Sequence, residues 1–189
     1  MRLILGSASP RRKELLAKIG VVPDDIVPAD IDETPQDAET PLVYVERLAR
    51  EKARVIGQAN PDAAVLAADT TVAVGRRILE KPNDADQARA FLKLLSGRRH
   101  RVYTAHALVK PDQSISSQVS LTRVAIKRLT QEEIDWYMGT DEWQGKAGGY
   151  AIQGAFGRFV PWINGSYTNV MGLDLAVTHG LLTGAGYRL

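Results

Sequence analysis

The chain opens with MRLILGSASPRR at residues 1–12, and this stretch decides how the fold is expected to begin. Residues 2–6 form a short apolar run, which is typical of a buried strand. Ser9 followed by Pro10 is a helix-start signature, with serine as the cap and proline at the first helical position. Gly20 would end that helix. The opening therefore predicts a strand, a loop and a helix, in that order.

Similar start and stop signals divide the residues that follow. Thr40 and Pro41 repeat the pair of cap and proline, and an apolar stripe at helical spacing comes after them. Residues 63–68 are expected to form a buried strand that ends at Asp69. The other expected elements are a strand at residues 25–29, an acidic loop at 30–39, a hairpin from 70–74 and 78–81, and a helix from Asp84 to near Gly97.

The second half of the chain continues to alternate between strands and helices. Residues 102–109 and 114–126 flank a Pro-Asp-Gln turn and are expected to pair as antiparallel strands. Thr130 and Glu133 form a capping box for a short helix. The remaining expected features are the end of that helix at Gly139, a glycine-rich segment at 145–157 and a final helix from about Val170. This pattern predicts an α/β fold.

Composition narrows the class of protein. Lys and Arg number 24 against 22 Asp and Glu, so the chain lacks the basic excess expected of a nucleic-acid-binding protein. It has no cysteine and three scattered histidines, so oxygen ligands, which Mg²⁺ prefers, would hold any metal ion. No stretch resembles a signal peptide or a membrane span. We therefore expect a cytoplasmic protein with one domain over residues 1–189 and with no nucleic-acid or membrane partner.

The loop before the first helix is the first candidate binding site. The hydroxyls of Ser7 and Ser9, backbone N–H groups and the positive end of the helix dipole would together attract an anion. Arg11 and Arg12 could clamp phosphate oxygens. The alternative is a plain capped helix whose arginines face water, and for this short segment alone that alternative is the commoner case.

Acidic residues near strand ends are the second candidate site. Asp69 would lie at the rim of the sheet, where open α/β folds bind ligands, and Glu33 of the acidic loop could complete a Mg²⁺ site. Lys52 and Lys81 could contact further phosphates. Each has a plain alternative: a turn residue for Asp69, a solvated loop for Glu33, and ordinary surface positions for the lysines.

Several separated motifs, taken in their order and spacing, resemble the Maf family along nearly the whole chain. The resemblance implies a mixed α/β fold of the Maf and inosine triphosphatase type, with an elongated, twisted sheet flanked by helices, a cleft between two lobes and, frequently, a homodimer. The motifs are SASPRRKELL at residues 7–16, DE at 32–33, REKA at 50–53, ADT at 68–70, EKP at 80–82, KAGGYAIQG at 146–154 and INGSY at 163–167.

The same resemblance implies an activity and assigns roles. It implies hydrolysis of nucleoside triphosphates between the α and β phosphates, with a divalent cation such as Mg²⁺ or Mn²⁺, in a house-cleaning role. Asp69 would be the general base on the attacking water, and Glu33 and Asp69 would hold the metal. Because a bound metal lowers the pKa of water, a carboxylate is a sufficient base. The triphosphate would be bound by Arg12, Lys52 and Lys81, together with the loop hydroxyls of Ser7 and Ser9.

Three positions resemble the family branch that acts on thymidine and uridine triphosphates (dTTP and UTP), with their modified forms as further candidates: Arg11, Thr70 and Gln153. The other branch carries an aromatic residue in place of Arg11. The amide of Gln153 matches the N3–H and a ring carbonyl of uracil or thymine, but when flipped it could also bind cytosine. A group that only donates hydrogen bonds, either Arg11 or a backbone N–H facing O4, would then reject cytosine. Apart from the resemblance, Gln153 would be assigned as a loop amide bonded to backbone.

Other functions stay open on the sequence alone. The same hydrolysis of modified purine nucleotides such as 7-methyl-GTP belongs to the other branch, and Arg11 argues against it. A nucleotide-binding regulator of septum formation could keep the phosphate loop without turnover, but Asp69, Glu33 and Lys81 favour catalysis. The basic run at residues 98–101 lacks the interleaved aromatic residues of a nucleic-acid module.

Overall fold

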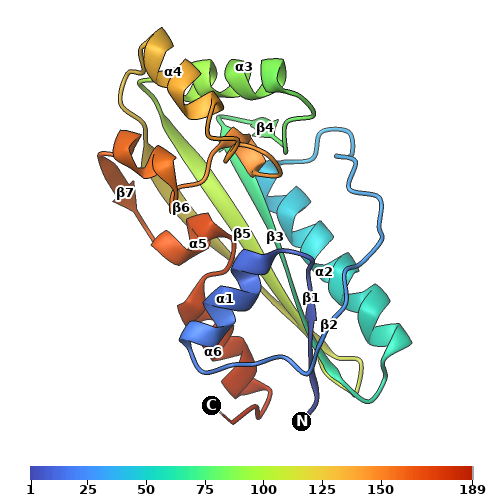
Figure 1. Cartoon of the computed structure of the whole chain (residues 1–189). Coiled ribbons are helices and arrows are strands. Elements are labelled where there is room, and N and C mark those ends of the chain that lie inside the picture. The colour runs from blue at the N-terminus through green and yellow to red at the C-terminus, as the bar shows by residue number, and fades with distance from the viewer. Residues whose placement is uncertain (189) are drawn as a thin grey trace.

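The computed structural model describes residues 1–188 and has a seven-stranded mixed sheet at its centre (Figure 1). The strand order is β2-β1-β3-β5-β6-β7, and β4 pairs with β3 outside that path. β1 is parallel to β2 and β3, and the other pairings are antiparallel. The strands are β1 (Leu3–Gly6), β2 (Asp25–Ile26), β3 (Ala64–Val74), β4 (Arg77–Leu79), β5 (Arg99–Val109), β6 (Ile115–Ala125) and β7 (Trp162–Asn164). The predicted mixed α/β fold is confirmed.

Helices flank this sheet on both sides. They are α1 (Pro10–Lys18), α2 (Pro41–Ala59), α3 (Ala85–Leu95), α4 (Gln131–Met138), α5 (Tyr167–Met171) and α6 (Leu175–Gly184), with 3₁₀ turns η1 (Ala147–Gly149) and η2 (Ala155–Phe159). Within residues 1–188, none of the helices combines the length and the apolar character needed to cross a membrane.

Three strands of 11 residues each, β3, β5 and β6, run the length of the molecule (Figure 1). β3 pairs with β5 from Val65 to Ala73, and β5 pairs with β6 over its whole length. Long antiparallel ladders of this kind are continuous sets of backbone hydrogen bonds. The elongated shape of the sheet follows from these three strands.

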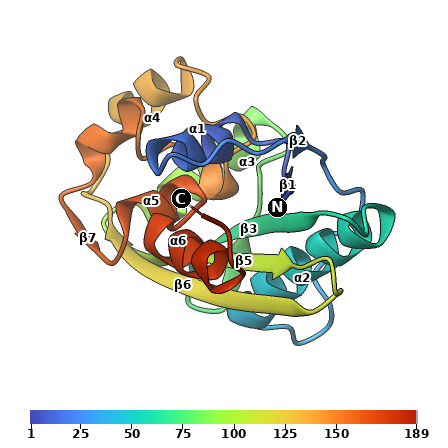
Figure 2. The same cartoon turned by 90° about the horizontal axis from the view of Figure 1, so that it is seen from below.

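Helix α2 covers one face of the sheet, opposite α1 and α6 (Figure 2). Thr40 caps it, because its hydroxyl accepts a hydrogen bond from Val43 N, and Pro41 occupies the first helical position. The apolar stripe of the helix, including Val45 and Ala53, packs on strand residues such as Val65. The stripe predicted from sequence is therefore the buried side of this helix, except at its first residue, Leu42, which is 46% exposed.

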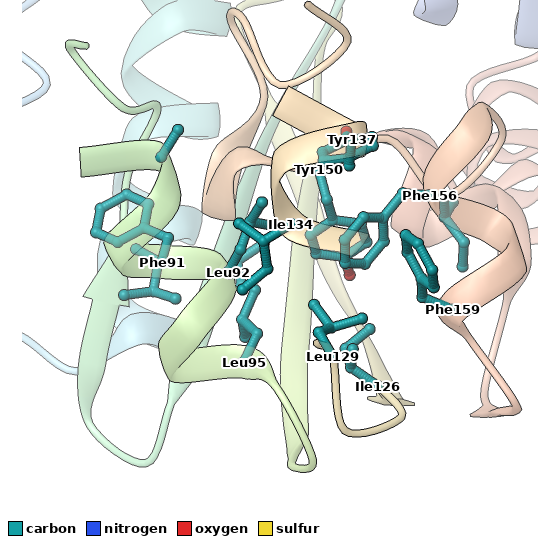
Figure 3. Close-up of a cluster of buried hydrophobic side chains, with 14 of the residues drawn as sticks. Phe91, Leu92, Leu95, Ile126, Leu129, Ile134, Tyr137, Tyr150, Phe156 and Phe159 are labelled. Atoms are coloured by element: carbon teal, nitrogen blue, oxygen red, sulfur yellow. The ribbon is translucent and has the colours of Figure 1, made fainter. Parts of the chain in front are cut away.

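Two separate clusters cover the opposite face of the sheet, and they define two lobes. The lower lobe contains α1 and α6, where Leu15 and Leu182 pack with Leu66. The upper lobe contains α3, α4 and the 3₁₀ turns around a group of aromatic rings (Figure 3). The Phe156 ring is fully buried, with its centroid 4.8 Å from those of both Tyr137 and Tyr150.

The capping box predicted at Thr130 is present: its hydroxyl accepts from Glu133 N, and the Glu133 carboxylate accepts from Thr130 N. Ser9 stands at the predicted N-cap of α1, but its side chain makes no capping hydrogen bond within the described chain. The strand predicted at residues 25–29 was too long, since β2 ends at Ile26. Val27 N still donates to Leu5 O, and the pairing stops there because β1 itself ends at Gly6.

The predicted end of one strand and the predicted final helix were also wrong. The strand expected to end at Asp69 continues to Val74, so Asp69 lies in its interior, because pairing with β5 continues past it. The final helix expected from about Val170 is divided into α5 and α6. Gly172, with a left-handed φ of 114°, ends α5, and Asp174 caps α6 by accepting from Ala176 N. Side-chain pattern alone does not show such a break.

Candidate active site

A gap in strand pairing defines the candidate site. On one edge of β3, β1 pairs up to Ala67 and β4 pairs from Val72 onward. Among residues 1–188, no strand pairs with β3 on this edge across residues 68–71. A cavity of about 440 Å³ lies here, with walls from both lobes. Asp69 thus lies inside its strand and still faces open space, which the sequence could not indicate.

All ten residues that the sequence analysis assigned to the site line this one cavity. They come from the loop before α1, the first turn of α1, the acidic loop, α2, β3, the segment after β4 and the glycine-rich segment. Their location in one cavity is a finding, while their individual roles stay predictions. The residues are Ser7, Ser9, Arg11, Arg12, Glu33, Lys52, Asp69, Thr70, Lys81 and Gln153.

The side chains of Asp69 and Thr70 point to opposite faces of β3, as successive strand residues must. Asp69 faces α2, where Lys52 Nζ lies 2.6 Å from its Oδ1 and 2.7 Å from Glu33 Oε1. The side chains of Lys52 and Asp69 are 11% and 12% exposed, whereas that of Glu33 is 46% exposed. One buried ammonium group therefore joins the two carboxylates.

The acidic loop is held so that Glu33 reaches this ammonium group. The Tyr44 hydroxyl on α2 donates to Glu33 O over 2.8 Å, and Arg47 on the same helix donates to Thr34 O. Burial acts to raise the pKa of Glu33, but the hydrogen bond and charge of Lys52 outweigh it, and the pKa lies below its ordinary value. Glu33 is therefore an anion at neutral pH.

The donor set can be tested for a divalent cation. Within the described chain, no three His, Asp or Glu side chains gather as a metal site on their own. Glu33 and Asp69, however, both lie within hydrogen-bonding distance of one ammonium group, so both carboxylates can reach a single cation. Mg²⁺ is commonly bound by one or two carboxylates, with water and substrate phosphates supplying the other ligands. The residues present fit that arrangement.

Arg12, at the start of α1, is held from three directions. Its Nε donates to Gly172 O over 2.8 Å, its Nη1 to Ser7 Oγ over 2.9 Å and its Nη2 to Thr70 Oγ1 over 3.2 Å. Burial lowers the pKa of this guanidinium, and the Asp69 carboxylate opposes that effect. Arginine remains a cation even so. A fixed positive charge therefore lies on the side of β3 opposite Lys52.

The Ser7 hydroxyl is placed to donate into the cavity. Its oxygen accepts from Arg12 Nη1 and, over 3.2 Å, from Ser9 N, so both lone pairs are used. Only its proton remains for a ligand. The predicted anion-binding loop therefore presents a hydroxyl donor, and Ser9 contributes to it through its backbone.

The glycine-rich segment forms the opposite wall, and one of its residues had no role in the sequence analysis. Lys146 lines the cavity, and its ammonium group donates to Gln144 O. Burial and the charge of Arg11 lower the pKa of Lys146. Its place in the KAGGYAIQG motif was a signal that could have identified it. Gln153, on the same segment, is exposed.

Comparisons with known proteins show the family of this chain. The model of a family described as Maf-like protein matches residues 2–185. A protein of Roseobacter denitrificans named dTTP/UTP pyrophosphatase is 60% identical over 98% of this chain and 97% of its own length. A protein of Ruegeria sp. with the same name is 56% identical over 100% of this chain and 97% of its own.

Solved structures show the same fold in more distant proteins. A HAM1 protein from Coxiella burnetii aligns with a TM-score of 0.53 over 97% of this chain and 98% of that protein, at 16% identity. At that identity the likeness concerns the fold alone. The extent of the family match and the identity of the full-length relatives establish that this chain belongs to the Maf-like family.

Proposed function

We propose that this protein is a nucleoside triphosphate pyrophosphatase that converts dTTP and UTP to the monophosphate and pyrophosphate. The observation that carries the proposal is the cavity at the β3 gap, where two carboxylates lie among five cationic side chains, those of Arg11, Arg12, Lys52, Lys81 and Lys146. Full-length relatives at 60% and 56% identity bear the name of that activity. A site that holds both anionic and cationic groups suits a polyanionic substrate together with an activated water.

The reaction assigns a task to each group. Water attacks the α-phosphorus, the bond from that phosphorus to the α,β-bridging oxygen breaks, and pyrophosphate leaves with the bond electrons. Asp69 accepts the proton of the attacking water. Arg12 binds the phosphates in the substrate and in the transition state alike, and Lys52 and Lys81 balance the negative charge as it moves toward the leaving group. Ser7 donates its remaining proton to a phosphate oxygen.

Glu33 and Asp69 would hold a divalent cation, Mg²⁺ or Mn²⁺. When bound, such an ion supplies charge neutralisation at the phosphates and lowers the pKa of a bound water. Lys52, which joins the two carboxylates here, could then turn its ammonium group toward a phosphate. A homodimer, a cytoplasmic location and a single domain over residues 1–189 stay predictions from the sequence.

The first test is a substrate panel. With Mg²⁺ or Mn²⁺, the purified protein should release pyrophosphate from dTTP and UTP, and EDTA should abolish the release because the carboxylates then lose their cation. Phosphate and pyrophosphate are quantified separately for each nucleoside triphosphate. Release of single phosphates, or no turnover across the panel, would contradict the proposal.

We propose that Gln153 and Arg11 determine which nucleobase the site accepts. Gln153→Ala should weaken the use of both UTP and dTTP by roughly 1–3 kcal/mol, because a base-edge hydrogen bond is lost. Arg11→Ala should instead narrow the difference in kcat/KM between UTP and CTP, since the Gln153 amide could then flip to meet cytosine. If Arg11 binds only phosphate, Arg11→Ala slows all nucleotides alike, and an unchanged ratio ends the base-recognition role.

A further inference from the structure

A chain of hydrogen bonds runs from Arg12 into the interior, away from the cavity. Arg12 Nη2 lies 3.2 Å from Thr70 Oγ1, which lies 3.0 Å from Thr104 Oγ1, and Thr104 Oγ1 lies 2.9 Å from Asn169 O. Thr104 is on β5, directly opposite Thr70 in the ladder, and Asn169 is on α5. Thr104 and Asn169 are fully buried and are not in the cavity wall. This series of hydrogen bonds therefore joins the site to two buried residues outside the cavity wall.

The donor and the acceptor of every hydrogen bond in this series can be deduced. Thr104 donates to the carbonyl oxygen of Asn169, and a hydroxyl has only one proton. Thr104 must therefore accept from Thr70, and Thr70, whose proton is then used, must accept from Arg12. All the protons point from the guanidinium toward α5. As a result, Thr70 can act toward a ligand only as an acceptor.

The other bonds of Arg12 fix the plane of its guanidinium group. An arginine has five N–H donors: one on Nε and two on each terminal nitrogen. Gly172 takes the first, while Ser7 and Thr70 each take one from a terminal nitrogen. Within residues 1–188, one N–H on each terminal nitrogen has no protein partner. These two N–H groups remain available to donate to phosphate oxygens.

We propose that Thr104 is a positioning residue for phosphate binding, acting through the hydroxyl of Thr70 to fix the orientation of Arg12. This inference rests on one part of the proposed function, namely that the ligand bound by Arg12 carries phosphates. Thr70 then influences selectivity mainly by holding Arg12. With the Thr104 acceptor removed, the Thr70 hydroxyl can rotate and the two available N–H groups of Arg12 lose their fixed direction.

The central comparison is Thr104→Val against Thr104→Ser. Valine keeps the shape and removes the hydroxyl, whereas serine keeps the hydroxyl and removes a methyl group. Thr104→Val should raise KM for UTP about tenfold and change kcat by less than about threefold, as expected when binding common to substrate and transition state is lost. Thr104→Ser should stay within about twofold of wild type. Failure of serine to restore KM would overturn the proposal.

Thr122→Val is the matched control. Thr122 is an equally buried threonine on β6 whose hydroxyl bonds to Asn169 Nδ2 and to the backbone of Ser166, but not to Thr70. It should disturb α5 without raising KM more than about twofold. A KM increase equal to that of Thr104→Val would show that general loosening of α5 is the cause and would overturn the proposal.

A double-mutant cycle tests the route through Thr70. If Thr104 acts only through that hydroxyl, adding Thr104→Val to Thr70→Val should leave KM within about twofold of the Thr70→Val value. If the two residues act independently, the KM increases of the two single variants should multiply in the double variant. If the valine variant does not fold, the cycle is repeated with Thr104→Ala, which also removes the hydroxyl and has a smaller side chain. A multiplicative result with either substitution contradicts the proposal.

Binding of inorganic pyrophosphate, measured by calorimetry with wild type and each variant, separates this inference from the proposed function. Its Kd should rise roughly fivefold to tenfold in Thr104→Val and be restored in Thr104→Ser. That result would support the positioning role even if no nucleotide is turned over. Equal affinities in all variants would overturn it even if the protein is an active pyrophosphatase.

Discussion

Asp69→Asn is expected to lower the rate of pyrophosphate release from dTTP and UTP by at least about a hundredfold. The substitution removes the proposed base and one of the two carboxylates proposed to hold the cation. It also removes the negative partner of Lys52, 2.6 Å away. Steady-state kcat and kcat/KM for both nucleotides, with saturating Mg²⁺, measure the effect.

The control for this variant is a second buried carboxylate outside the cavity. Asp174 is 8% exposed, close to the 9% of Asp69, and its carboxylate caps α6. Asp174→Asn keeps an oxygen acceptor for the cap and should leave kcat within about threefold. Both variants should unfold cooperatively in the same urea titration as wild type, which shows that they are folded. Near-normal activity in Asp69→Asn would assign the role of base to another carboxylate, of which Glu33 is the closest candidate.

Phe156→Ala should lower the free energy of unfolding by about 3–5 kcal/mol. The ring is fully buried, and its centroid lies within 5.4 Å of those of Tyr137, Tyr150 and Phe159 (Figure 3). Its removal leaves a void that these rigid neighbours cannot fill. Urea unfolding of wild type and variant gives the difference.

Leu121→Ala provides the comparison, since Leu121 is 40% exposed on β6 and should lose less than about 1 kcal/mol. Phe156→Ala should also weaken substrate binding, because Tyr150 packs on Phe156 and lines the cavity. An unchanged KM, combined with the expected loss of stability, would show that the upper-lobe core does not shape the cavity.

The sequence predicted the elements that depend on local chemistry. The cap at Thr40 and the capping box at Thr130 need only neighbouring residues, and both are present. The long pair of β5 and β6 was also predicted, although β5 begins at Arg99, three residues before the expected start. Periodicity and caps are properties of short windows, so sequence alone suffices for them.

The features that sequence could not supply depend on distant segments. The position of Asp69 inside β3 follows from pairing with β5, and its access to the cavity follows from where β1 and β4 end. Contacts between Arg12 and Gly172 join residues far apart in the chain. Thr104 carries no local signal, since an isolated buried threonine on a strand is an ordinary sheet residue.

The three long strands also restrict how the cleft can move. The lower lobe packs on β3 and β5 through Leu66 and Leu108, and the upper lobe packs on the same strands through Val72 and Val102. Rotation of one lobe against the other would therefore have to twist or break the ladder between β3 and β5 in its middle. The continuous sheet therefore opposes a hinge movement between the lobes. Any closing over a nucleotide must come from the loops at the rim, such as the acidic loop that carries Glu33.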